Sequence, residues 1–180
     1  LALKTYDIAS LGKILLEIAK RLRLISKAVE PQERRGERPT WIGRRMPNAL
    51  AILALHQWKK RERFDAHRRH IANIYATHLD PTRVVLPIWS QDADPTFLHY
   101  PIRTSHRDKL FVAAKKARIQ LGDWYTSPLA PEGVDENAVG YDRAATPQAV
   151  TLAEDTLNLP THIHINEEDV QRIVELINTI

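Results

Sequence analysis

The chain has 180 residues, of which 43% are hydrophobic and 27% are charged, and its net charge is +4. This length is sufficient for one domain with a sizeable core. The absence of cysteine excludes disulfides, thiolate metal sites and cysteine nucleophiles, and favours a cytoplasmic protein. No apolar run approaches the roughly 20 residues that span a bilayer, and the first residues are not typical of a signal peptide. We therefore expect a soluble protein.

The charge is divided unequally along the chain. Residues 1–79 hold 17 lysines and arginines against 7 aspartates and glutamates, a net charge of +10, whereas residues 80–180 hold 9 against 15, a net charge of −6. This division indicates either a basic face for nucleic acid or an anionic membrane, or two parts or two copies that dock on each other.

The strongest periodic pattern lies near the N-terminus. Apolar residues recur there at alternating steps of three and four, which places them on one helical stripe: Ile8, Leu11, Leu15, Ile18, Leu22, Ile25 and Val29. The opposite face of this predicted helix is basic, with Lys13, Lys20, Arg21, Arg23 and Lys27. The helix is expected to end at Glu30, because Pro31 disfavours the helical conformation in the residue before it. The chain begins at Leu1, close to this pattern, as a domain fragment or a processed product would.

Residues 32–40 are charged and contain Gly36 and Pro39, which predicts an exposed linker. A second long helix is predicted from Pro47 to about Leu79, where apolar residues keep a period near 3.6.

Strands are predicted over residues 84–88 and 97–103, because these segments are rich in β-branched and aromatic residues and a turn-forming stretch separates them. A helix capped by Ser105 is expected to run to Lys116, followed by a strand over residues 119–125.

Two further helices are predicted near the C-terminus. The first covers residues 147–157, and the last is opened by Asn166, whose acidic first turn suits the helix dipole. Together the elements predict an α+β fold with a small antiparallel sheet covered by helices on one face and preceded by two long helices.

Five stretches carry a family resemblance by their order and spacing. They are Arg45-Met46-Pro47-Asn48-Ala49-Leu50-Ala51, residues 68–75, Tyr100-Pro101-Ile102-Arg103, Trp124-Tyr125-Thr126-Ser127-Pro128-Leu129, and residues 157–161 followed by 166–170. From about residue 40 to its end the chain resembles the C-terminal domain of DegT/StrS-type sugar aminotransferases. The resemblance implies a fold-type-I dimer with a large domain that binds pyridoxal 5'-phosphate and a small domain that closes the cleft. Residues 1–46 would then be a helix and linker from the large domain, and residues 47–180 the C-terminal small domain.

The resemblance also implies an activity. Members of this type transfer an amino group from an amino-acid donor to a keto-sugar nucleotide, in nucleotide-sugar biosynthesis for cell-envelope polysaccharide. The chemistry needs a lysine that forms a Schiff base with the cofactor and a carboxylate beside its pyridine nitrogen. In the family both lie in the large domain, and no matching lysine motif occurs in this chain, where Lys13 and Lys20 lie among basic helix residues. We expect the chain alone to be inactive.

Arg44 and Arg45 are the candidate cofactor-binding residues. The family commonly has an asparagine two residues before the Arg-Met pair, which contacts the cofactor phosphate of the partner subunit, and here Gly43 stands there. Because a guanidinium matches phosphate geometry with paired donors, either arginine is suited to a phosphate or a sugar nucleotide. Docking of the linker is the alternative for both side chains.

Trp124 and Tyr125 are the candidate substrate-binding residues, as aromatic groups that line the cleft. Packing within a strand is the alternative for both. The family often has a histidine after the Pro-Leu pair that follows them, and Ala130 takes its place here.

Two histidine pairs have spacings that metals use. His162 and His164 share one face of an extended segment, and His67 and His70 are one helical turn apart. Neither pair has a clear third ligand, so we predict surface or interface histidines and no metal site. Asp65 near His67 is interpreted as part of an exposed helix face.

Two other functions remain open. The basic stripe over residues 13–27 and the cluster Lys59, Lys60, Arg61, Arg63, Arg68 and Arg69 are typical of a module that binds nucleic acid or an anionic membrane. A catalytically silent or regulatory relative of the aminotransferases is the other, and the Gly43 and Ala130 departures allow it. We favour the enzyme, because the ordered motifs point to the family.

Overall fold

The computed structural model of the protein describes residues 11–22, 24 and 29–180. The chain divides into two compact units, one formed by residues up to Ile42 together with Gly133–Tyr141, and the other by Gly43–Glu132 and Asp142–Ile180. Each unit is described by itself.

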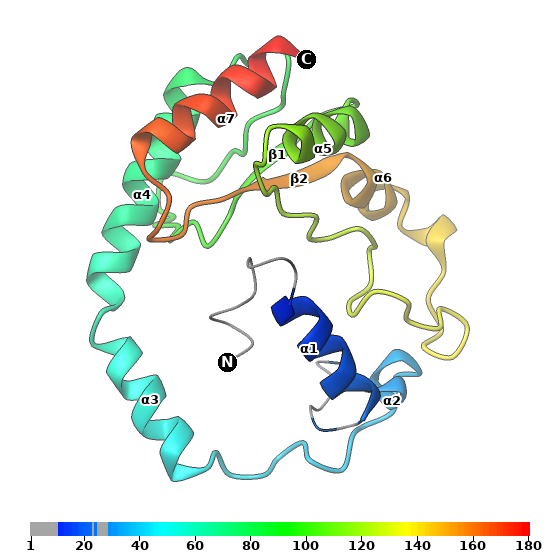
Figure 1. The fold of residues 1–180 in the computed structure, drawn as a ribbon. Coiled ribbons are helices and arrows are strands. Elements are labelled where there is room, and N and C mark those ends of the chain that lie inside the picture. Colours follow the sequence, from blue (N-terminus) through cyan, green and yellow to red (C-terminus); the bar gives the residue numbers. More distant parts are fainter. Residues whose placement is uncertain (1–10, 23, 25–28) are drawn as a thin grey trace. The chain divides into compact units, whose positions relative to one another are not determined.

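The first unit contains helices α1 (Leu11–Arg21) and α2 (Pro31–Arg34) (Figure 1). The predicted stripe is partly observed: Ile8 and Ile25 lie outside the described residues, while Leu15, Ile18 and Leu22 are all exposed. The predicted end of this helix at Glu30 is wrong, since α1 ends at Arg21.

Pro31 begins a helix, whereas its predicted role was to end one. Glu30 has an extended backbone and forms a capping box with Glu33, and proline suits the first position of a helix because its fixed φ is already helical. The predicted linker over 32–40 is therefore partly helical, and its Pro39 is buried. The segment Gly133–Tyr141 belongs to this unit and is joined to α2 by a hydrogen bond from the Asp135 amide to the Arg34 carbonyl, 2.7 Å long.

In the second unit the predicted single helix over 47–79 is divided into α3 (Asn48–Trp58) and α4 (Arg61–His78). The division falls at Lys59 and Lys60, which form a turn in which the Lys60 amide donates to the Gln57 carbonyl at 2.9 Å. Every residue of α3 is exposed, including Leu50, Ile52, Leu53, Leu55 and Trp58.

A two-stranded antiparallel sheet lies at the centre of the second unit. Its strands are β1 (Tyr100–Arg103) and β2 (Thr156–Leu159), with Tyr100 opposite Leu159 and Ile102 opposite Leu157. The predicted strands over 84–88 and 119–125 are wrong, because each contributes only one bridge, Val85 to Arg103 and Gly122 to Asn158. The predicted strand over 97–103 begins only at Tyr100, since Phe97 has φ of 49°.

The sheet buries one face beneath three helices. Tyr100, Ile102, Leu157 and Leu159 point into a core with buried residues from α4, from α5 (Arg107–Lys116) and from α7 (Glu167–Thr179). Figure 1 shows α4 and α7 side by side next to the sheet. The α+β prediction, with a small antiparallel sheet covered by helices, is confirmed.

Helix ends follow local chemistry where a side chain caps them. The Asn166 prediction is confirmed: its side chain accepts from the Asp169 amide at 2.8 Å, and the Asp169 carboxylate accepts in return from the Asn166 amide. The Ser105 prediction is wrong, because α5 begins after His106 and the Thr104 hydroxyl accepts from the His106 amide.

The remaining helices precede β2. Helix α6 (Pro147–Asp155) follows the short 3-10 helix η1 (Arg143–Ala145). The helix predicted over 147–157 ends two residues early, because Thr156 and Leu157 are extended and pair with β1.

Substitution of Leu157 by alanine tests the role of the buried sheet face. Leu157 is fully buried, so the variant loses transfer free energy and leaves a cavity; we expect the free energy of unfolding to fall by about 2 to 5 kcal/mol. Urea denaturation of the chain measures this. As a control, Val112→Ala on α5, where the side chain is 56% exposed, should change the free energy of unfolding by less than about 0.5 kcal/mol. Equal effects of the two variants would contradict the described core.

Candidate functional site: an aromatic groove beside the sheet

A groove of about 460 Å³ lies between α6 and the face of the sheet that points away from the core. Pro101, Thr156 and Asn158 lie on this second face, because side chains alternate across a strand and the neighbouring positions point into the core. We call it the aromatic groove. Its lining comes from both strands, from the two residues before β1, from α6 and from the loop after Gly122: Leu98, His99, Pro101, Trp124, Tyr125, Ser127, Pro128, Ala149, Leu152, Ala153, Thr156 and Asn158.

Two aromatic side chains form one wall of the groove. Trp124 and Tyr125 stack with ring centroids 5.9 Å apart at an interplanar angle of 18°, and they are 64% and 59% exposed. Both rings are therefore largely open to solvent, and their role in substrate binding stays a prediction. Flat exposed rings of this kind suit a planar or ring-shaped ligand.

His99 and Asn158 complete the polar part of the wall. The His99 ring meets Trp124 edge-on, with centroids 6.3 Å apart. The Asn158 side-chain amide donates to the Trp124 carbonyl, which ties the aromatic loop to β2. Neither residue was predicted as a site residue. Asn158 carried a signal, since it is a polar residue between two apolar strand positions, Leu157 and Leu159.

Arg44 and Arg45 lie elsewhere in the second unit. Both are exposed in the irregular stretch before α3, and neither lines the aromatic groove. The structure therefore does not bring the predicted cofactor-binding and substrate-binding residues together, and the role of the two arginines stays a prediction. Gly43 next to them has φ of 88°, a conformation that favours glycine and that asparagine adopts more readily than most residues.

The histidines of the two predicted pairs lie at the segment that follows β2 and leads into α7. His67 on α4 contacts the His162 carbonyl through Nε2 at 3.1 Å, and His70 Nε2 lies 2.7 Å from the Glu167 carboxylate. The ring centroids of His162 and His164 are 6.2 Å apart. Within the described part of the chain, no three histidine or acidic side chains are arranged to hold a metal ion.

Comparisons with known proteins give the family. The family model for the DegT/DnrJ/EryC1/StrS aminotransferases matches residues 12–178. The chain belongs to this family.

Individual relatives agree with this assignment. A protein from Geobacillus stearothermophilus named "Pleiotropic regulatory protein" is 29% identical over 130 residues, covering 71% of this chain and 34% of the relative. Two crystal structures share the fold: a DegT DnrJ EryC1 StrS aminotransferase from Brucella abortus (TM-score 0.60, 22% identity, 69% of this chain and 33% of that one), and DesV from S. venezuelae in complex with a ketimine intermediate (TM-score 0.66, 20% identity, 91% and 44%). This DegT-family chain therefore spans about a third of the length of the Geobacillus and Brucella relatives and less than half of the length of DesV.

The groove of this DegT-family chain is incomplete as a site for pyridoxal phosphate. A Schiff base needs a lysine amine at the cofactor, yet no lysine among the described side chains lines the aromatic groove. Lys59, Lys109, Lys115 and Lys116 are exposed on helices or at their ends. The residues present do not fit the whole cofactor, and we derive no catalytic step through it.

No helix in the described residues is long and apolar enough to cross a membrane.

His162 provides a test of the electrostatics beside the groove. Burial and the neighbouring His164 and His67 lower the pKa of His162 below its ordinary value, as His99 does, whereas Asp169 acts in the opposite direction. Because the folded pKa is depressed, folded chains bind fewer protons than unfolded chains just below about pH 6.5, so stability is present above that pH and is lost as the pH falls through the folded pKa.

We expect His162→Gln to reduce the loss of stability between about pH 7 and pH 5. Urea denaturation at several pH values measures this, and NMR titration of His162 in the folded chain and in denaturing urea gives the two pKa values. A folded midpoint at or above the urea value would contradict the described surroundings of His162.

Proposed function

We propose that this chain is the C-terminal part of a pyridoxal-phosphate-dependent aminotransferase of the DegT/StrS type, which transfers an amino group from an amino acid to a keto-sugar nucleotide. In this proposal the lysine that forms the Schiff base lies outside the 180 residues. The observation that carries it is the aromatic groove: an open hollow with stacked, exposed Trp124 and Tyr125 and with no described lysine in its lining. Such a groove has one wall of a ligand site and lacks the reactive amine.

The surface of α3 supports a larger protein. The helix has apolar residues on all its sides, among them Leu50, Ile52, Leu53, Leu55 and Trp58, and each is more than half exposed. A helix that is hydrophobic all round is normally buried, because each exposed apolar side chain leaves area in water that burial would remove. We infer that α3 is covered in the complete protein, which we propose to be a cytoplasmic homodimer of two-domain subunits.

Within this proposal the residues of the chain bind and orient the substrate. Trp124 and Tyr125 stack on the sugar or the base of the sugar nucleotide, with His99 and Asn158 beside them, and Arg44 and Arg45 contact phosphate groups. Pyridoxal phosphate, when bound in the complete protein, supplies the electron sink for transamination.

Borohydride reduction of the complete natural protein loaded with pyridoxal phosphate tests where the lysine is. Reduction makes the Schiff base permanent, so we expect one phosphopyridoxyl-lysine, in a peptide outside these residues, and visible absorbance before reduction. Peptide mass spectrometry locates the adduct. An adduct on Lys59 or another lysine of the chain would contradict the proposal.

Replacement of Trp124 tests the groove as a substrate wall. Loss of ring stacking costs about 1 to 3 kcal/mol, so we expect Trp124→Ala in the complete enzyme to raise KM for the sugar nucleotide roughly tenfold, with Trp124→Phe close to wild type. Trp41→Ala is the matched control, since Trp41 is exposed and does not line the groove. Steady-state kinetics with the sugar nucleotide varied gives the comparison, and equal KM values for the alanine variants would remove Trp124 from the site.

A second candidate is a catalytically silent regulatory relative. It is favoured by the name of the Geobacillus relative and by Gly43 and Ala130, which stand where the family commonly has a phosphate-contacting asparagine and a histidine. A complete protein that gives no lysine adduct and no visible absorbance with pyridoxal phosphate would support it. Binding of nucleic acid or anionic membrane through the basic helices is a third; it would appear as retention that weakens steeply with salt.

A further inference from the structure

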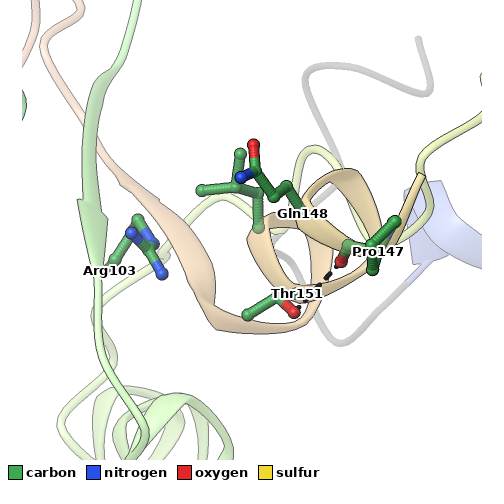
Figure 2. A pocket seen from close by; sticks show the side chains of 5 residues that line it. Arg103, Pro147, Gln148 and Thr151 are labelled. Atoms are coloured by element: carbon green, nitrogen blue, oxygen red, sulfur yellow. Dashed lines mark hydrogen bonds between the residues drawn. The ribbon is translucent and has the colours of Figure 1, made fainter.

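A second hollow, of about 470 Å³, lies on the same side of the sheet at the Arg103 end of β1. It is lined by Arg103 and by four residues of α6, Pro147, Gln148, Thr151 and Leu152, and we call it the Arg103 hollow. Figure 2 shows Arg103 on the strand and the polar side chains of Gln148 and Thr151 on the helix across from it. Hollows of this volume are within the range that small molecules occupy.

Arg103 is held in place by its backbone but is poorly paired through its side chain. Its amide and carbonyl both pair with Val85, at 3.0 and 2.8 Å. The Arg103 side chain is 40% exposed, and its Nη2 reaches the Asp155 carboxylate only at 3.4 Å. The Arg103 Nε atom is buried and has no hydrogen-bond partner among the described residues. A buried donor without an acceptor is costly, so the site is short of acceptor atoms.

The other lining residues limit what would supply these acceptors. The Gln148 side-chain amide is a further donor on the α6 side of the hollow. The Thr151 hydroxyl donates to the Pro147 carbonyl at 3.1 Å and is therefore already used. Pro147 and Leu152 add apolar surface next to these polar groups. The ligand that fits is thus an oxygen anion with a short hydrocarbon part.

We propose that the Arg103 hollow binds the carboxylate of a small aliphatic acid. The carboxylate accepts from the Arg103 guanidinium and from the Gln148 amide, and the hydrocarbon contacts Pro147 and Leu152. Carboxylate geometry matches the fork of donors on a guanidinium. A monoanion is preferred over a phosphate dianion because the neighbouring Asp155 carboxylate repels the second negative charge more strongly. This site does not depend on the aminotransferase proposal, since it uses neither Trp124 nor the cofactor.

NMR titration of the full 180-residue chain with sodium butyrate tests the proposal. We expect saturable shifts at the Gln148 and Thr151 amides and at the Arg103 Nε–H, with butyrate binding at least about tenfold more tightly than butanol, its uncharged analogue. Sodium chloride at matched ionic strength and inorganic phosphate are the other arms. Arg103→Gln should reduce the butyrate affinity to that of butanol, whereas Arg83→Gln, which removes an exposed arginine outside the hollow, should leave it unchanged.

Three results would overturn the proposal: no saturable shift with butyrate, the same affinity in Arg103→Gln, or phosphate binding as tightly as butyrate. If Arg103→Gln disturbs the spectrum of the whole chain, Gln148→Leu replaces it, since Gln148 is on a helix surface and its loss leaves the β1 pairing intact. That variant should bind butyrate several-fold more weakly, and an unchanged affinity would also overturn the site.

Discussion

Burial of one face of the sheet is the interaction on which the rest of the second unit depends. A two-stranded sheet is at best marginally stable in water, because each strand pairs on only one side. Here Tyr100 and Ile102 from β1 and Leu157 and Leu159 from β2 are fully buried against α4, α5 and α7. Helix α4 is also tied to the end of β2, because the Tyr75 hydroxyl donates to the Pro160 carbonyl. Burial raises the pKa of Tyr75 well above its ordinary value, so the hydroxyl stays neutral. The hydrophobic core thus fixes the register of the strands.

That register also creates the functional face. Because side chains alternate, fixing Ile102 and Leu157 toward the core places Pro101, Arg103, Thr156 and Asn158 on the opposite side, beneath α6. Both hollows lie there and share Leu152. A one-residue slip of β2 would turn its leucines to this side and remove both hollows together. The chemistry of the site is therefore coupled to the packing of the core.

Local signals predicted the parts of the fold that local interactions determine. The Asn166 cap and the acidic turn after it act over three residues, and they gave the start of α7 correctly. The strands are harder to predict, since β1 pairs with β2 far along the chain, and the sequence pattern places the first two residues of β2 in a helix. The Phe97 backbone, with positive φ, shortened one strand, and no residue type there indicated it. Pro31 was ambiguous because proline both ends a helix and begins one.

The candidate site shows the same division. Trp124 and Tyr125 were predicted from a motif, whereas His99 and Asn158 joined them only through the pairing of β1 with β2 and of Gly122 with Asn158. Arg103 is the last residue of the Tyr100-Pro101-Ile102-Arg103 stretch, yet its unpaired Nε depends on how α6 approaches the sheet, which no sequence spacing reveals.

The aromatic groove and helix α3, both exposed in the second unit, differ in their mixture of polar and apolar groups. The aromatic groove combines rings with polar groups, so its surface can be exposed to water and is suited to reversible binding of a ligand. Helix α3 has no such mixture: its leucines, isoleucine and tryptophan are exposed around the whole helix, and only a permanent protein surface would remove that apolar area from water. The chain spans about a third of the length of the Geobacillus and Brucella relatives. The difference between the two surfaces is explained if α3 is internal in the complete protein and the groove is part of its cleft, as we propose. The contrast between the two surfaces supports the proposal that α3 is covered in the complete protein while the groove stays open to a ligand.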